Sequence, residues 1–245
     1  HMDIREIEYH VGGQRMVGQL AVPDGDGARP GVLVAHEGPG IDDNAKRRAA
    51  RITEELGCVT FALDYIGDGR RLEGGMPAVR ERLAPLREDP LQTRALGQAG
   101  LDVLTACDRT DSTALAAIGH CFGGTLALEL ARGGAPLAAV VGFHSGLATT
   151  RPQDATNITG SILVCIGADD ATIPADQRAA FEAEMTAAGV DWQMHVYGGV
   201  VHSFTNPTVD GVEMPMLKYD APADRRSWTA MLELFGSAFS PRSDA

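Results

Sequence analysis

The chain has 245 residues, of which 44% are hydrophobic and 22% charged, a balance typical of a globular protein with a buried core. Its formal net charge of -12 argues against nucleic acid or an anionic membrane surface as a partner, because both carry negative charge themselves. No apolar run approaches the length of a membrane span, so we expect a cytoplasmic protein with no membrane partner. We interpret His1-Met2 as the remnant of an expression tag.

Patterns typical of strands alternate with patterns typical of helices along the chain. The predicted strands cover residues 4–10, 14–22, 30–36, 58–63, 113–118, 137–143, 161–167 and 191–197. The predicted helices cover residues 43–57, 90–107, 125–132, 174–189 and 224–239. This alternation indicates an α/β fold, with a mostly parallel, doubly wound sheet and helices on both faces. With no repeat or linker in the sequence, we expect one domain over residues 1–245.

The pattern loosens between residues 66 and 89, where glycines and arginines are frequent. We expect this segment to be an excursion beyond the sheet edge, a possible cap that shapes the substrate site. We expect the arginines at 70–87 to form a solvated helical face rather than a substrate clamp.

Cysteines occur at four widely separated positions, with no spacing typical of a metal site: Cys58, Cys107, Cys121 and Cys165. We expect Cys58, Cys107 and Cys165 to act as small hydrophobic side chains rather than as disulfide partners. No metal and no nucleotide fingerprint is indicated.

The most informative motif is Gly-His-Cys-Phe-Gly-Gly over residues 119–124. It joins a predicted strand to a predicted helix, with glycines two residues on either side of Cys121. This is the pattern of the nucleophile elbow of α/β-hydrolases, in which glycines allow a tight turn around a strained nucleophile. A cysteine in that place predicts covalent catalysis through a thioester.

An acid and a histidine follow two later strands, in the order that an α/β-hydrolase requires. Asp169 and Asp170 come after the strand at 161–167, and His202 comes after the strand at 191–197. The carboxyl ends of parallel strands meet at one edge of a sheet, so these side chains are expected to lie near Cys121.

With these residues, nearly the whole sequence resembles the dienelactone hydrolase family. The resemblance rests on Glu37, on the motif at 119–124, on Asp170 four residues before Pro174, and on His202-Ser203-Phe204. It implies an α/β-hydrolase fold and a cofactor-free hydrolase of carboxylic esters or lactones. By similarity, Asp170 rather than Asp169 is the acid of the triad.

The expected roles follow from the chemistry of such triads. Cys121 attacks as a thiolate, His202 accepts and returns the proton, and Asp170 orients His202. The backbone N–H groups of Phe122 and Gly38 are the candidate oxyanion hole.

Glu37 is a further candidate catalytic residue, since the glutamate at this place in the family interacts with the thiol. A carboxylate repels a permanent thiolate, which suggests a neutral resting thiol that ionises when Glu37 reorganises. The alternative is that Glu37 caps its loop or pairs with an arginine.

Substrate recognition is expected to differ from that of the family's archetype, which holds a carboxylate-bearing lactone with arginines. One of those arginines stands four residues after the histidine, where this sequence has Asn206. Asparagine offers neither charge nor a bidentate fork. The candidate substrate-binding side chains are therefore Asn206, Arg80 and Tyr65.

Three functions remain open at this point. The first is hydrolysis of small carboxylic esters or lactones, and the second is promiscuous hydrolysis of aryl esters or phosphotriesters. The third is a non-catalytic redox sensor in which Cys121 is oxidised reversibly. We expect a small-molecule ester or lactone as the only ligand, no cofactor, and a monomer or weak homo-oligomer.

Overall fold

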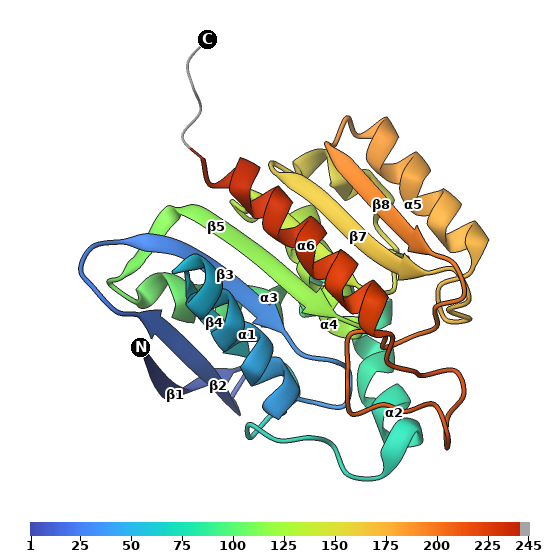
Figure 1. The fold of residues 1–245 in the computed structure, drawn as a ribbon, viewed down its shortest axis with the longest axis horizontal. Helices are drawn as coiled ribbons and strands as arrows, with labels where there is room; N and C mark the ends of the chain where they lie inside the picture. Colours follow the sequence, from blue (N-terminus) through green and yellow to red (C-terminus); the bar gives the residue numbers. More distant parts are fainter. Residues whose placement is uncertain (241–245) are drawn as a thin grey trace.

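A twisted eight-stranded sheet runs through the centre of the molecule (Figure 1). The computed structural model describes residues 1–240. The strands are β1 (Met2–Val11), β2 (Gln14–Pro23), β3 (Arg29–Ala35), β4 (Val59–Leu63), β5 (Thr110–His120), β6 (Ala139–Phe143), β7 (Ser161–Gly167) and β8 (Trp192–Tyr197). They lie in the order β1-β2-β4-β3-β5-β6-β7-β8. Strands β3 to β8 are parallel, and the opening hairpin β1–β2 joins β4 antiparallel.

Helices cover both faces of this sheet (Figure 1). They are α1 (Asp43–Leu56), α2 (Gly75–Glu88), α3 (Pro90–Ala106), α4 (Phe122–Arg132), α5 (Ala175–Ala187) and α6 (Ala221–Ala238), with a short 3-10 helix η1 (Pro152–Asn157). One apolar core lies beneath α1 and α6, and a second lies beneath α2 to α5. The expected α/β-hydrolase architecture, with its doubly wound and mostly parallel sheet, is confirmed.

The central strands are buried on both faces, which explains their nearly continuous apolar sequences. All residues of β4 and β6 are buried. Strand β5 is longer than the predicted 113–118, because Thr110 and Asp111 also pair with β3 across a shift in register. Within residues 1–240, no helix is long and apolar enough to cross a membrane.

The segment at 66–89 contains a helix, α2, for which the sequence analysis gave no bounds. Its apolar residues Val79, Leu83 and Leu86 do recur at helical spacing and are buried. Pro85 within the helix and the glycines before it obscure the pattern. Helix α2 lies near the carboxyl ends of the parallel strands (Figure 1), and its role as a cap over the substrate site stays a prediction.

The turn between β5 and α4 needs its glycines because backbone approaches backbone there. A Cβ atom on Gly119 would collide with the backbone of Gly123 and Gly124. One on Gly123 would collide with the carbonyl oxygens of Ala35 and His36, which connects the turn tightly to the end of β3. The turn therefore has a single geometry that holds Cys121 in place.

We expect Gly119→Ala to lower the free energy of unfolding by about 3 kcal/mol or more, since no flexible side chain can move away from the new methyl group. Gly236→Ala is the matched control. Gly236 is exposed in α6 with open space around it, so alanine there should stabilise the helix by about 1 kcal/mol. Urea denaturation of both variants measures the difference, and a Gly119→Ala variant as stable as the wild type would contradict this description of the turn.

Candidate active site

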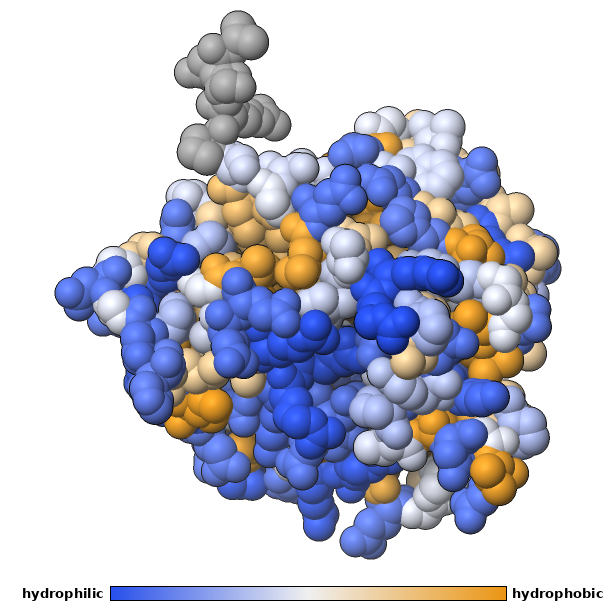
Figure 2. All heavy atoms as spheres, in the orientation of Figure 1, coloured by the Kyte–Doolittle hydropathy of each residue, from blue (hydrophilic) through white to orange (hydrophobic). Residues whose placement is uncertain are grey.

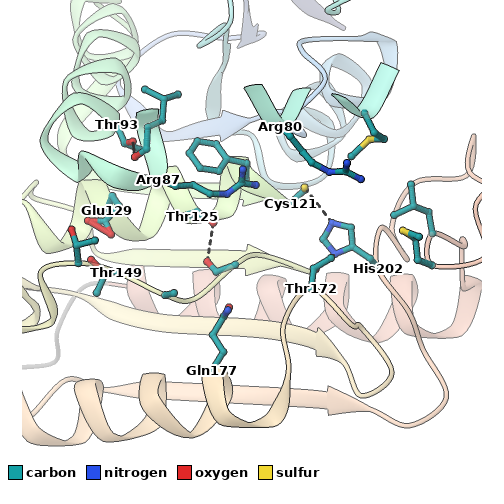
Figure 3. A pocket seen from close by; sticks show the side chains of 18 of the residues that line it. Arg80, Arg87, Thr93, Cys121, Thr125, Glu129, Thr149, Thr172, Gln177 and His202 are labelled. Atoms are coloured by element: carbon teal, nitrogen blue, oxygen red, sulfur yellow. Dashed lines mark hydrogen bonds between the residues drawn. The ribbon is translucent and has the colours of Figure 1, made fainter. Parts of the chain in front are cut away.

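Three side chains that are far apart in sequence meet at the carboxyl edge of the sheet. Cys121 stands between β5 and α4, Asp170 follows β7, and His202 follows β8. The Nε2 atom of His202 lies 3.2 Å from the Sγ atom of Cys121. Its Nδ1 atom lies 2.6 Å from Oδ2 of Asp170. Figure 3 shows the imidazole of His202 directed at the sulfur. The spatial convergence expected from the sequence is present.

A fourth side chain, Thr172, fixes the carboxylate of Asp170. Both its backbone N–H and its hydroxyl donate to Oδ1 of Asp170, at 2.9 Å and 2.6 Å. The second oxygen of Asp170 is thereby left for His202. Asp169, the neighbouring acid, is exposed and takes no part in this network.

The backbone of Cys121 is strained, with φ 55 and ψ -128. Positive φ in a residue other than glycine costs about 1–3 kcal/mol and is concentrated at functional sites. Helix α4 begins at the next residue, so its N-terminal positive dipole end lies at the sulfur, where it favours negative charge. As the first residue of the helix, Phe122 has a backbone N–H with no partner inside α4.

The electrostatics favour a positively charged His202. Burial lowers the pKa of His202, but the negative charge of Cys121 and the hydrogen bond to Asp170 outweigh it, so that the pKa lies well above its usual value. Burial likewise raises the pKa of Asp170, yet hydrogen bonds from His202 and Thr172 bring it below its usual value. These two shifts favour an imidazolium–carboxylate pair between His202 and Asp170.

Glu37 lies beside this trio and is held by Asn206. The amide of Asn206 donates to Oε2 of Glu37 at 2.8 Å, and the backbone N–H and hydroxyl of Thr208 fix the other end of the amide. Oε1 of Glu37 is buried without a hydrogen bond, 3.8 Å from Nε2 of His144. Burial raises the pKa of Glu37 in spite of the hydrogen bond from Asn206. This shift weakens the repulsion of a thiolate that the sequence analysis emphasised.

Two cavities open from the sulfur of Cys121. The first cavity, about 440 Å³, runs beneath α2 and α4, and Figure 3 shows much of its lining. The second cavity, about 570 Å³, lies between the loop after β3 and the segment 206–217. Both are bounded by Cys121 and His202 and share the side chains of Met76, Met214 and Leu217.

The sequence of this chain matches a known protein family. A sequence model of the dienelactone hydrolase family matches residues 16–239. The chain belongs to the dienelactone hydrolase family. This finding confirms the resemblance drawn from the motifs, and it makes the protein a hydrolase.

Individual relatives in this family are similar over almost their whole length. A solved dienelactone hydrolase-like promiscuous phosphotriesterase from metagenomic libraries is 41% identical, with a TM-score of 0.92 over 98% of this chain and 99% of that one. The solved structure m3DLH is 44% identical, with a TM-score of 0.93 and the same coverage. Protein usf of Aquifex pyrophilus is 30% identical over 225 residues, covering 88% of this chain and 93% of the relative.

The candidate substrate-binding residues of this dienelactone hydrolase family member fall in three different places. Asn206 lines the second cavity and Arg80 lines the first. Tyr65 lines neither, because it is fully buried, stacks on His36 and donates its hydroxyl to the carbonyl of His36 at 2.7 Å. The assignment of Tyr65 to the substrate is therefore wrong, and its contacts instead fix the end of β3. Gly38, the second candidate oxyanion donor, is buried beneath Val79 and Leu83 of α2.

The sequence analysis missed several residues of the site. Thr172 stands two residues after Asp170, a spacing at which a threonine commonly bonds an aspartate, and this signal was available. Met214, Met216 and Leu217 come from a segment before α6 to which no role was given. That segment is joined to the site by two backbone hydrogen bonds of His202, to Met216 at 3.2 Å and from Lys218 at 3.1 Å.

Three buried histidines surround the trio without adding charge to it. Burial lowers the pKa of His36 to about 4 and that of His120 to about 3, and it brings that of His144 well below the usual value. They are neutral at physiological pH. Among residues 1–240, no group of three or more histidine, cysteine or acidic side chains is arranged to hold a metal ion.

Proposed function

We propose that this protein hydrolyses carboxylic esters or lactones through a thioester on Cys121, with His202 as acid and base and Asp170 as its orienting residue. The observation that carries the proposal is the hydrogen-bonded chain from Cys121 Sγ through His202 to Asp170, built on a strained turn. Membership of a hydrolase family supports it.

In the first half of the reaction, the sulfur of Cys121 attacks the carbonyl carbon and the carbonyl oxygen becomes negatively charged. The N–H of Phe122, at the start of α4, and that of Gly38 stabilise this oxygen. Loss of one such donor costs about 3 kcal/mol in related chemistry. The imidazolium of His202 then gives its proton to the departing alkoxide, and the thioester remains.

In the second half, His202 is neutral and acts as a base. It takes a proton from water as the oxygen attacks the thioester, and the carboxylic acid leaves as sulfur is released. Asp170 stabilises the positive charge that returns to the imidazole. No cofactor takes part in either half.

Glu37 has a modulating role in this scheme. Held by Asn206, its carboxylate stands close to the site, with a raised pKa that limits its negative charge. We expect Asn206→Ala to release Glu37 and to change kcat more than KM for a neutral ester, because Asn206 acts on the substrate through Glu37. Michaelis kinetics with p-nitrophenyl acetate measure the split, and a change in KM alone would assign Asn206 to direct substrate binding.

The proposed function is tested by pre-steady-state kinetics with p-nitrophenyl acetate. We expect a burst of about one p-nitrophenol per active site if deacylation limits turnover. Replacing either Cys121 or His202 by alanine should abolish it. A redox sensor would give no turnover with any short ester.

A second candidate function is hydrolysis of aryl phosphotriesters, supported by the 41% identical relative, which is described as a promiscuous phosphotriesterase. Sulfur would attack phosphorus, the aryloxide would leave, and water would hydrolyse the phosphorylated cysteine. We expect Cys121→Ser to lower the rate with an aryl phosphotriester such as paraoxon, because a serine hydroxyl lacks the thiolate's nucleophilicity. Equal rates for wild type and variant would dismiss this reaction path.

A further inference from the structure

The two cavities meet at the reacting sulfur and the imidazole, because Cys121 and His202 line both of them. Figure 3 shows Thr125, Glu129 and Thr149 of the first cavity on the side of Cys121 away from His202. The second cavity has no residue of α4 in its lining and contains Ser203 and Asn206 instead. Only the first cavity therefore extends to the side of the sulfur away from the imidazole.

This arrangement assigns the two halves of an ester. The acyl half lies away from the departing oxygen, so it extends into the first cavity, toward Thr125 and Thr149. His202 must donate its proton to the departing oxygen, so the alcohol half lies beside the imidazole and extends into the second cavity, which His202 also lines. After the alcohol departs, the second cavity faces a thioester whose carbonyl is open to attack from the position that the alcohol has left.

We propose that this protein also transfers acyl groups from the Cys121 thioester to neutral alcohols bound in the second cavity. The proposal rests on the proposed thioester mechanism. The alcohol oxygen forms a bond to the carbonyl carbon, and its proton passes to Nε2 of His202. The carbon–sulfur bond breaks, sulfur leaves as a thiolate paired with the imidazolium, and a new ester is released. The step is the reverse of acylation and needs no further reactant.

The lining of the second cavity fits an alcohol better than water alone. A volume of about 570 Å³ far exceeds the roughly 30 Å³ that one water occupies in the liquid. Part of its wall is apolar, from Leu72, Met76, Val79, Val209 and Met214. These side chains give a hydrocarbon group a surface on which to bind.

The charges of the second cavity select the kind of alcohol. Glu37, Asp210 and Glu213 line it, whereas its one arginine, Arg71, is already paired with Asp42 at 2.9 Å. An anionic acceptor is therefore disfavoured. The expected acceptors are uncharged alcohols with an apolar body, such as benzyl alcohol.

The test supplies p-nitrophenyl butyrate as donor and benzyl alcohol as acceptor, and measures the ratio of benzyl butyrate to butyrate by chromatography. The ratio depends only on whether benzyl alcohol or water attacks the thioester, so it does not change when formation of the thioester slows. We expect it to rise and then saturate with benzyl alcohol. Val209→Trp, which fills the second cavity, should lower it about tenfold.

Ala148→Trp is the matched control, because Ala148 lines only the first cavity. This variant should accept a narrower range of acyl groups, while the ratio of benzyl butyrate to butyrate stays unchanged. If Val209→Trp does not fold, Val209→Phe replaces it. No benzyl butyrate, or a ratio that grows linearly and is the same in every variant, would overturn the proposal. Failure of the hydrolase itself would be distinct, since wild type would then release no p-nitrophenol.

Discussion

Cys121→Ala is expected to lower kcat/KM for p-nitrophenyl acetate by about 10⁴-fold or more, the scale on which removal of a catalytic nucleophile acts in related hydrolases. The methyl group keeps the Cβ atom and hence the same backbone strain at φ 55, so the fold should be unaffected. Steady-state assays and thermal unfolding of wild type and variant measure both quantities side by side.

Cys107→Ala provides a matched control for this substitution. Cys107 is a partly buried thiol at the end of α3 that lines neither cavity. Its removal should leave kcat/KM within about twofold of wild type, because surface changes away from special features have small effects. An active Cys121→Ala variant would mean that a different group attacks the substrate.

The second large effect is expected for the acid that follows β7. Asp170→Asn should lower kcat/KM by about 10³–10⁴-fold, because asparagine cannot stabilise the imidazolium or hold the productive tautomer of His202. Asp169→Asn is a close control, since it removes the same charge one residue away at an exposed position. Its rate should stay near that of wild type. Equal losses in both variants would contradict the assignment of Asp170.

Asp170→Asn is also expected to make the thiol of Cys121 less reactive. Together with the charge of Cys121, Asp170 raises the pKa of His202, so it stabilises the imidazolium that faces the sulfur. With Asp170→Asn the imidazolium loses that support, and the pKa of His202 falls. We therefore expect slower alkylation of Cys121 by iodoacetamide at pH 7 in this variant and a wild-type rate in Asp169→Asn. Equal rates in all three proteins would mean that Asp170 is not coupled to the sulfur.

Sequence patterns predicted the parts of the site that depend on local geometry. Gly119 and Gly123 are required because backbone meets backbone in the turn, and Gly124 because the side chain of Ser145 lies against it; this requirement is visible as a motif. Asp170 and His202 each follow a buried strand, and the parallel order of β5, β7 and β8 brings strand ends to one edge. The convergence of these side chains on Cys121 therefore follows from topology.

The cavity walls could not be predicted in the same way. Helix α2 has few apolar positions and an internal proline, so its sequence resembles that of a loop, yet it provides Met76 and Arg80 to the site. Tyr65 follows a buried strand as catalytic residues do, but its ring turns inward onto His36. Which way such a side chain turns is decided by packing with distant residues, which a linear pattern does not record.

The most direct measurement is mass spectrometry of the protein quenched with acid milliseconds after mixing with p-nitrophenyl butyrate. We predict a single added butyryl group, located by peptide mapping on the peptide that contains Cys121 and removed by neutral hydroxylamine. The signal should be absent in Cys121→Ala. A butyryl group on any other residue, or a burst of p-nitrophenol with no acylated protein at the same time point, would contradict the central role of the Cys121 thioester.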